Sequence, residues 1–459
     1  MTTPDIIPSS ERLMDSAPSQ GDAAQYRWLA KLKISAGELD AARRVLLQGL
    51  AAHSGDLDLH IMYACTAGDL EKVCAALEDL LPRFAEDPKA VSTILSAVTV
   101  HRAKLKRVRA GLQEEMGVSW EDTCTWPDPE GLERFRGVIK AQNKASPRVD
   151  LVLDGACVAI CDREWDRADG LLHVVRTNVS RTFADYAAFG AQFHQELDRF
   201  DYEAISGLLP PVTHILSPPV QSGETLLLAS DPKYFRKFTL PFIAALDRME
   251  IPADLHVHIM GGDPESWRAM CAGLEAFTHV RVGFSAEDPG PFASGSSNIS
   301  LYCHAIRYVR LFQEAARRQR RMWVLDVDVF VRKDPRPLLS RLAEFDVAIR
   351  TNPCLLSPPA RIAGGLTGIA PTPRGLEFAR RVAAYIVYWK ERGTWAWGID
   401  QVALFSTYAY LDKIGQPPRT YFQGPADVSS GEGSDAIFYF PTGVKKYFVG
   451  EPAAPEISV

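Results

Sequence analysis

The sequence predicts an α/β protein in which a sheet domain follows an all-α region. Three observations lead to this prediction. Helix-forming residues dominate 23–117, short apolar strands alternate with helices after residue 222, and Pro- and Gly-rich segments separate the two parts. Strands that alternate with helices build largely parallel sheets, which bind ligands beyond the carboxyl ends of their strands. We therefore expect the functional site in the second half of the 459 residues.

Composition argues against several classes of function. The chain carries 51 basic and 57 acidic residues, a net charge of −6, which argues against binding to nucleic acid. It has no apolar run of the roughly 18 residues that a membrane span needs. The start lacks the basic and apolar regions of a secretory signal, and eight scattered cysteines form no C-x-x-C pair. These features predict a cytoplasmic protein with reduced thiols.

The N-terminal region is expected to be helical after a disordered polar tail at 1–22. Within 23–117, the segment Ala36–Ala42 recurs as Ala67–Val73, in each case with a Gly followed by an acidic helix start. This echo predicts two helix–turn–helix pairs and resembles a degenerate tetratricopeptide module, with a plain helical bundle as the alternative. Such a module could bind a protein partner or acceptor.

The elements of the second half follow in a regular order. Residues 118–221 are expected to form a mostly helical middle region or linker, 222–450 the sheet domain, and 451–459 a tail. The expected elements are strand 225–229, helix 238–249, strand 255–260, helix 268–277, strand 279–282, helix 299–320 and strand 322–325.

Two carboxylates at the end of the last of these strands give the sharpest chemical signal. Asp326 and Asp328 follow the apolar run Met322–Leu325, and extended backbone would place both side chains on one face. Paired carboxylates suit one hard divalent cation, and burying them without one is costly. A second D-x-D, Asp56–Asp58, lies in the helical region and follows no strand. The alternative for Asp326 and Asp328 is a solvated strand end.

Four motifs in this order resemble those of retaining nucleotide-sugar glycosyltransferases, the group that includes glycogenin and bacterial lipopolysaccharide galactosyltransferases. The resemblance covers about half of the chain and implies the Rossmann-like GT-A fold. It also implies a transferase that moves a sugar from a nucleotide-diphosphate sugar, with a UDP-sugar as the expected donor, to an acceptor. The motifs are Asp231–Tyr234 after the first strand, Tyr308–Leu311 on the long helix, Asp326 with Asp328, and Trp397–Gln401.

The resemblance implies a role for each matching residue. Whether Asp400 would form a covalent intermediate or only shield an oxocarbenium-like state is left open. By resemblance, Asp231 and Tyr234 contact the nucleotide base, Arg310 fixes the sugar diphosphate, Asp326 and Asp328 bind Mn²⁺ or Mg²⁺, Asp400 and Gln401 face the transferred sugar, and Gly443 and Lys446 belong to a phosphate-gripping motif near the end.

The chain departs from the family pattern at two positions. Phe440 stands where the family has a metal-ligating His, and Ala363 stands where it usually has Asn. Because phenylalanine cannot ligate, the cation would rely on phosphate oxygens and water, or on an acid such as Asp427, Glu432 or Asp435.

Three other interpretations are weighed against this one. A haloacid-dehalogenase-type phosphatase also has D-x-D after an apolar strand, but that strand normally begins its domain, whereas three strand–helix units precede Asp326. A helical-repeat interaction protein with a degenerate transferase domain is favoured by Phe440 and Ala363. His256 and His258 could share a metal, but no third ligand lies near them in the sequence, which favours ordinary strand residues.

Overall fold

The computed structural model divides the chain into two compact units. The helical unit contains the N-terminal helices and helix α8, and the sheet unit contains the remaining elements. The predicted tails lie outside the described residues, except for Asp22. The structure describes residues 22–35, 37–110, 119–125, 129–145, 149–178, 186–217, 223–290, 296–355, 357–393, 397–429 and 435–440.

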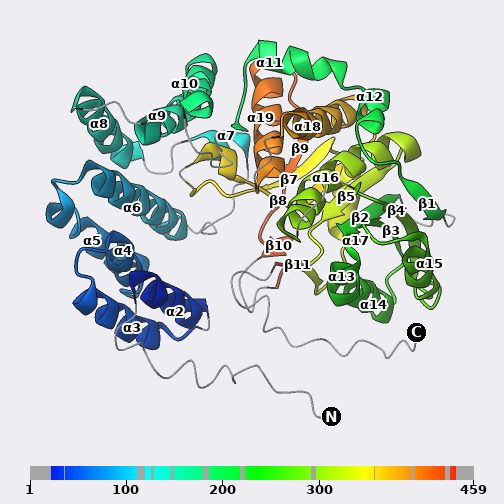
Figure 1. Ribbon diagram of the computed structural model, residues 1–459, viewed down its shortest axis with the longest axis horizontal. Coiled ribbons are helices and arrows are strands. Elements are labelled where there is room, and N and C mark those ends of the chain that lie inside the picture. The colour runs from blue at the N-terminus through cyan, green and yellow to red at the C-terminus, as the bar shows by residue number, and fades with distance from the viewer. Residues whose placement is uncertain are drawn as a thin grey trace. The chain divides into compact units, whose positions relative to one another are not determined.

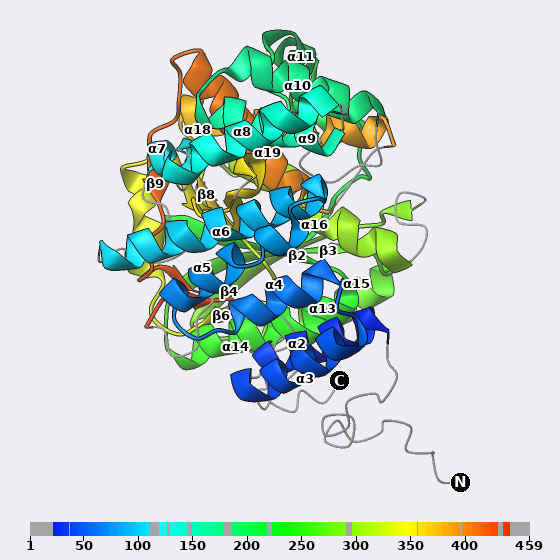
Figure 2. The same ribbon diagram turned by 90° about the vertical axis from the view of Figure 1, so that its left-hand side faces the viewer.

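The helical unit consists of antiparallel helix pairs (Figure 2). Gly37 joins the first pair and Gly68 the second, with φ of 78° and 118°, a conformation that glycine adopts without steric cost. Asp69 then caps the next helix by accepting a hydrogen bond from the backbone of Lys72 at 2.9 Å. The two predicted turns are therefore present. The helices are α2 (Ala23–Ser35), α3 (Leu39–Ala52), α4 (Leu57–Cys65), α5 (Leu70–Glu78), α6 (Pro88–Arg109) and α8 (Pro129–Ala145).

The sheet unit is built on an eight-stranded sheet in the order β1-β4-β3-β2-β5-β8-β7-β9 (Figure 1). Strands β2 to β5 run parallel, β1 and β8 pair antiparallel to their neighbours, and the four strands predicted from the sequence are all present. The predicted α/β class with a preceding all-α region is confirmed. The strands are β1 (Thr213–Leu216), β2 (Glu224–Ser230), β3 (Ala253–Met260), β4 (Val280–Glu287), β5 (Arg321–Leu325), β7 (Val347–Thr351), β8 (Ile362–Ile369) and β9 (Thr420–Phe422).

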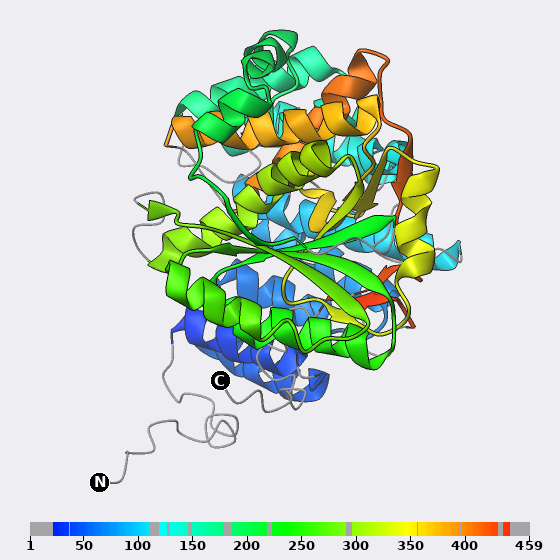
Figure 3. The same ribbon diagram turned by 90° about the vertical axis from the view of Figure 1, so that its right-hand side faces the viewer.

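Helices cover both faces of this sheet because its strands are apolar on both faces (Figure 3). Along β2, Leu226 and Leu228 pack with the cluster that contains α14 and α15, whereas Leu227 and Ala229 pack with α16, α18 and α19. The alternation follows from the twofold period of a strand. The helices are α14 (Leu240–Arg248), α15 (Pro264–Ala272), α16 (Ser296–Arg318), α17 (Arg336–Leu339), α18 (Pro373–Glu391) and α19 (Ile399–Lys413).

Most of the predicted middle region belongs to the sheet unit. Trp120 donates a hydrogen bond to Asp412 on α19 at 3.0 Å, and Trp165 and Phe189 lie in the same core as α19. No described helix is both long enough and apolar enough to span a membrane. The middle helices of this unit are α7 (Trp120–Cys124), α9 (Val149–Cys161), α10 (Trp165–Asn178), α11 (Ala191–Glu196) and α12 (Tyr202–Gly207).

Candidate functional site

Four elements of the sheet unit bring the predicted acids together. The central strands β2 and β5 are parallel neighbours, and their carboxyl ends lead to Asp231 and Asp326. Helix α16 packs against β2 and β5, and the first turn of α19 carries Asp400. This edge of a parallel sheet is the place where α/β proteins bind ligands.

The D-x-D segment turns instead of continuing extended, which corrects our expectation. Asp326 donates its backbone N–H to Gly365 O at 2.8 Å, and the N–H of Val329 returns to Asp326 O at 3.3 Å. The next strand, β6 (Phe330–Val331), then leaves the large sheet. It joins a three-stranded sheet with β10 (Val428–Ser429) and β11 (Phe438–Tyr439). The turn exists because the two strands on either side of it pair with different sheets.

Arg307 on α16 connects the two ends of the site. Its guanidinium pairs with Asp326 Oδ1 through Nη1, and its Nη2 donates to Asp400 Oδ2 and to Gly364 O, both at 3.0 Å. Tyr308 donates its hydroxyl to the same Gly364 carbonyl at 2.7 Å. Arg307 is 4% exposed. A buried guanidinium with carboxylates on two of its nitrogens holds both acids in place.

Asp400 is fully buried and has a nitrogen of another side chain close to each carboxylate oxygen. Nε2 of His304 lies 2.7 Å from Oδ1, and Arg307 contacts Oδ2. Burial opposes ionisation, but the two partners outweigh it and lower the pKa of Asp400 to about 2. Asp400 is therefore a carboxylate at neutral pH. The His304 ring stacks on Trp397, with ring centroids 4.4 Å apart and planes 9° apart.

Two glycines of β8 leave room for these side chains. A Cβ on Gly364 would lie 2.6 Å from Asp400 Oδ2, and one on Gly365 would lie 3.1 Å from Asp326 Oδ2. A Cβ on Gly364 would therefore have to displace Asp400, and one on Gly365 would have to displace the Phe440 ring, which lies 2.7 Å from it. Ala363, the position where the family usually has Asn, directly precedes this pair and lies opposite Arg350 on β7.

Asp231 and Tyr234 lie together after β2. The Asp231 carboxylate accepts a hydrogen bond from the Tyr234 backbone at 2.8 Å and so caps helix α13 (Pro232–Tyr234). The Tyr234 ring is half-buried and lies 5.2 Å from that of Phe238. Burial, helped by the Asp231 charge, raises the pKa of Cys303 to about 12, so Asp231 lies close to the residue before His304.

Arg310 lies in a different set of contacts from the one its predicted role needs. It is 3% exposed and pairs with the buried Glu287 at the end of β4. It also donates to Pro210 O at 3.0 Å and to Gln313 at 2.6 Å. The structure thus brings Arg307, and not Arg310, to Asp326 and Asp400. Arg310 lies about one helical turn after Arg307 on α16, and it therefore reaches a different strand, β4, where it meets Glu287.

The remaining predicted residues are placed as follows. Gln401 is the next residue on α19 after Asp400 and is half-buried. Gly443 and Lys446 lie outside the described residues. Asp328 is 7% exposed in the turn after β5.

Carboxylate oxygens at Asp326 and Asp328 are the ligand type that Mn²⁺ and Mg²⁺ take. Arg307 uses Asp326 Oδ1, and the side chain of Asp326 is 31% exposed, so its other oxygen can accept a cation. The Phe440 ring lies next to Asp326. This ring and Asp326 Oδ2 would both contact a Cβ at Gly365, at 2.7 and 3.1 Å. Asp326 therefore keeps an oxygen that a cation could use, and the Phe440 ring lies beside that oxygen at the position where the family pattern has His.

The acids that could replace that ligand are already engaged or lie outside the described residues. Asp427 accepts from the Tyr421 hydroxyl and from the Gly424 backbone, both at 2.7 Å. Asp435 pairs with Lys333 at 2.5 Å. Glu432 lies outside the described residues. A cation would therefore depend on Asp326, Asp328 and oxygen ligands from substrate or water.

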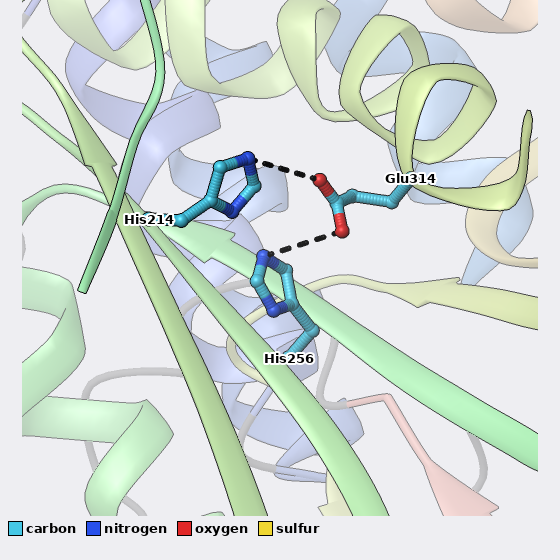
Figure 4. Close-up of side chains that lie close together, drawn as sticks. All are labelled: His214, His256 and Glu314. Carbon is cyan, nitrogen blue, oxygen red and sulfur yellow. Dashed lines mark ion pairs between the residues drawn. The ribbon is translucent and has the colours of Figure 1, made fainter. Parts of the chain in front are cut away.

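A separate cluster of metal-ligating residue types is an ion-pair network. His214, His256 and Glu314 each bring one possible ligand atom within 4.8 Å of the other two (Figure 4). Among the described residues, these three side chains form the group that lies close enough together to hold a metal ion. However, Glu314 accepts hydrogen bonds from Arg317 and from Arg318, both at 2.6 Å. Arg318 also donates to His256 Nδ1 at 2.9 Å, which leaves the ring hydrogen on Nε2, facing Ser285 at 2.8 Å. The positive charge that neutralises Glu314 is therefore supplied by arginine side chains, and the cluster needs no metal ion for this purpose.

His304 and Arg307 are the site residues that sequence reasoning missed. They lie three residues apart on α16, so they share a helix face. That spacing, beside the Tyr308–Leu311 motif, was the available signal. Arg307 and Arg310 are both buried because each pairs with a buried carboxylate.

Comparison with known proteins gives structural likenesses alone. No family model matches the sequence, and no curated protein matches it. The bifunctional glycosyltransferase WbbM (apo structure) is 14% identical, with a TM-score of 0.31; the match covers 51% of this chain and 44% of that one. Mouse xyloside xylosyltransferase 1 (apo form) is 13% identical, with a TM-score of 0.30 and coverages of 45% and 86%.

A third similar structure is the galactosyltransferase LgtC in complex with donor and acceptor sugar analogs. It is 16% identical, with a TM-score of 0.28 and coverages of 46% of this chain and 91% of that one. The chain thus spans less than half of WbbM. All three of these proteins are described as glycosyltransferases.

Proposed function

We propose that this chain is a glycosyltransferase that moves a sugar from a nucleotide-diphosphate sugar, a UDP-sugar first among them, to an acceptor. One observation carries the proposal: Arg307 holds Asp326 at the end of β5 and Asp400 at the start of α19 in one buried network. Breaking the bond between a sugar and a diphosphate leaves extra negative charge on the departing group. Arg307 is matched by two carboxylates in this network, so the charge that offsets the departing diphosphate would come from a cation held at Asp326 and Asp328.

Each part of the site has a role in this proposal. Asp231 and Tyr234 bind the nucleotide base, Asp326 and Asp328 hold Mn²⁺ or Mg²⁺, and Gln401 contacts the transferred sugar. Such a cation supplies charge that stabilises the departing diphosphate. Gly443 and Lys446 remain proposed phosphate ligands. The pairing of Arg310 with Glu287 supports giving the guanidinium role to Arg307.

The test is a hydrolysis screen of nucleotide sugars at neutral pH, with Mn²⁺, with Mg²⁺ and with a chelator. Release of free nucleotide from one donor, lost in the Asp326→Ala and Asp328→Ala variants, is expected. A matched control is Asp58→Ala, because the D-x-D of the helical region is predicted to have no role in the reaction. Turnover that survives both site variants would contradict the assignment.

One observation favours a second candidate, an interaction protein with a degenerate transferase domain. Phe440 lies beside Asp326 where a third ligand would be needed. A thermal-shift measurement separates the two functions. Stabilisation by UDP-sugar with Mn²⁺ is expected for the transferase, and no stabilisation by any nucleotide sugar would support the interaction protein.

A further inference from the structure

His304 occupies a distinctive position in this site. Its side chain is 12% exposed, and Nε2 lies 2.7 Å from the carboxylate of Asp400. One face of its ring is covered by Trp397, which is itself 62% exposed. His304 is thus a nearly buried imidazole at the rim of the site, held on one side by an acid and on another by an aromatic ring.

The partner of Nε2 decides what the other ring nitrogen can do. Asp400 is ionised at neutral pH and so can only accept hydrogen bonds. Nε2 lies 2.7 Å from Asp400 Oδ1 without an aligned hydrogen bond, but two lone pairs at this distance would repel, so the hydrogen of a neutral His304 is favoured on Nε2 and the lone pair is left on Nδ1. Within the described residues, no hydrogen bond to Nδ1 is found. An imidazole oriented by a carboxylate, with its second nitrogen free, is the arrangement of a general base.

We propose that His304 is the general base that removes the proton from the acceptor hydroxyl; this rests on the proposed function. The acceptor O–H gives its proton to Nδ1, and the acceptor oxygen forms a bond to the anomeric carbon. The bond between that carbon and the diphosphate oxygen breaks, and the nucleoside diphosphate leaves with the electron pair. The proton on His304 then passes to solvent.

The surroundings of His304 suit this role. Asp400 stabilises the imidazolium that forms, and Arg307 on the other Asp400 oxygen keeps that acid ionised. Asp400 from α19 and Arg307 from α16 are the charged groups that the described residues of these two helices place around His304. The exposed part of the Trp397 ring offers an apolar surface beside the His304 ring, on which the ring of a sugar acceptor can stack.

Hydrolysis of the donor tests the proposal without knowledge of the acceptor, because water then supplies the O–H. The variants are His304→Gln, whose amide can still donate to Asp400 but cannot act as a base, and His304→Ala. His173→Gln, an exposed histidine on α10 of the same unit, is the matched control. The substrate is the nucleotide sugar that wild type hydrolyses best, and kcat and KM are measured from pH 5 to 9.

We expect His304→Gln to lower kcat by roughly 10²- to 10⁴-fold, the usual contribution of a general base, with KM little changed. The acid limb of the wild-type pH profile should disappear in this variant. Added imidazole should restore hydrolysis in His304→Ala, which a purely structural role would not allow. His173→Gln should behave as wild type throughout.

Different outcomes refute the two proposals. If His304→Gln keeps kcat within a few-fold of wild type, or keeps the acid limb, His304 is not the base. If His304→Ala is folded, by its thermal unfolding, and binds UDP-sugar yet imidazole does not restore turnover, the base proposal also fails. If wild type neither hydrolyses nor is stabilised by any nucleotide sugar, the proposed function itself is wrong.

Discussion

Replacing Arg307 with methionine tests the ion-pair network on which the site is built. Methionine keeps most of the volume but removes the charge, and so leaves the fully buried Asp400 with His304 as its remaining partner. Removing one partner of a buried ion pair usually costs about 3–5 kcal/mol, because the other charge stays buried without compensation. We expect a loss of this size in the free energy of unfolding.

The pKa of Asp400 gives an independent check on the magnitude. A value of about 2 against an ordinary 3.8 means that the site favours the ionised form by roughly 2 kcal/mol, at 1.36 kcal/mol per pKa unit. That preference already includes the cost of burial, so the attraction from Arg307 and His304 exceeds it. A loss of several kcal/mol on removal of Arg307 is consistent with both calculations.

The assay is urea unfolding at pH 7, followed by near-ultraviolet circular dichroism. Arg307→Met should lower the midpoint strongly, and the double variant Arg307→Met/Asp400→Asn should recover part of the loss because no buried charge is orphaned. Arg336→Met breaks an exposed pair with Asp334 and should leave the midpoint unchanged. A loss below about 1 kcal/mol for Arg307→Met, or a double variant less stable than the single one, would refute the reasoning.

Three further predictions concern the same site. Because the folded pKa of Asp400 lies below its unfolded value, its contribution to stability is present above about pH 4 and lost as the pH falls towards 2; acid titration of the unfolding midpoint should show a shallower fall in Asp400→Asn. Gly364→Ala, whose Cβ would lie 2.6 Å from Asp400 Oδ2, should lower donor hydrolysis roughly 100-fold with the fold intact by circular dichroism. Phe440→His adds an imidazole beside Asp326 and should tighten Mn²⁺ binding about tenfold in calorimetry, a gain of about 1.4 kcal/mol, and unchanged affinity would show that position 440 does not face the cation.

Strands β2 to β5 of the sheet unit were predictable because their signals are local. Apolar runs such as Leu226–Leu228 and Met322–Leu325 fill strands buried on both faces, and their order along the chain implies parallel pairing. The turn at Asp326–Asp328 was not predictable in this way. It exists because β6 pairs with β11, a strand that lies more than 100 residues later in the sequence.

The contacts made by the side chains of α16 were even harder to predict from the sequence. Arg307 and Arg310 are one turn apart and look alike in the sequence, yet one joins Asp326 to Asp400 and the other pairs with Glu287. Which guanidinium reaches the site depends on the rotation of the helix over the sheet, and hydrophobic spacing defines that rotation only to within a residue or so. Tertiary contacts between acids far apart in the sequence settle it.

The geometry of Asp400 bears on a question that the sequence left open, namely whether this carboxylate would attack the sugar to form a covalent intermediate. A carboxylate that attacks an anomeric carbon needs an oxygen with a free lone pair facing the sugar. Asp400 is fully buried, and His304 and Arg307 each take one of its oxygens. Attack by Asp400 would require it to leave this buried position beside its partners and reach the anomeric carbon, in a medium where an unpaired charge is costly. Under the proposed function, Asp400 therefore serves better as the residue that positions the His304 imidazole and the Arg307 guanidinium than as a nucleophile.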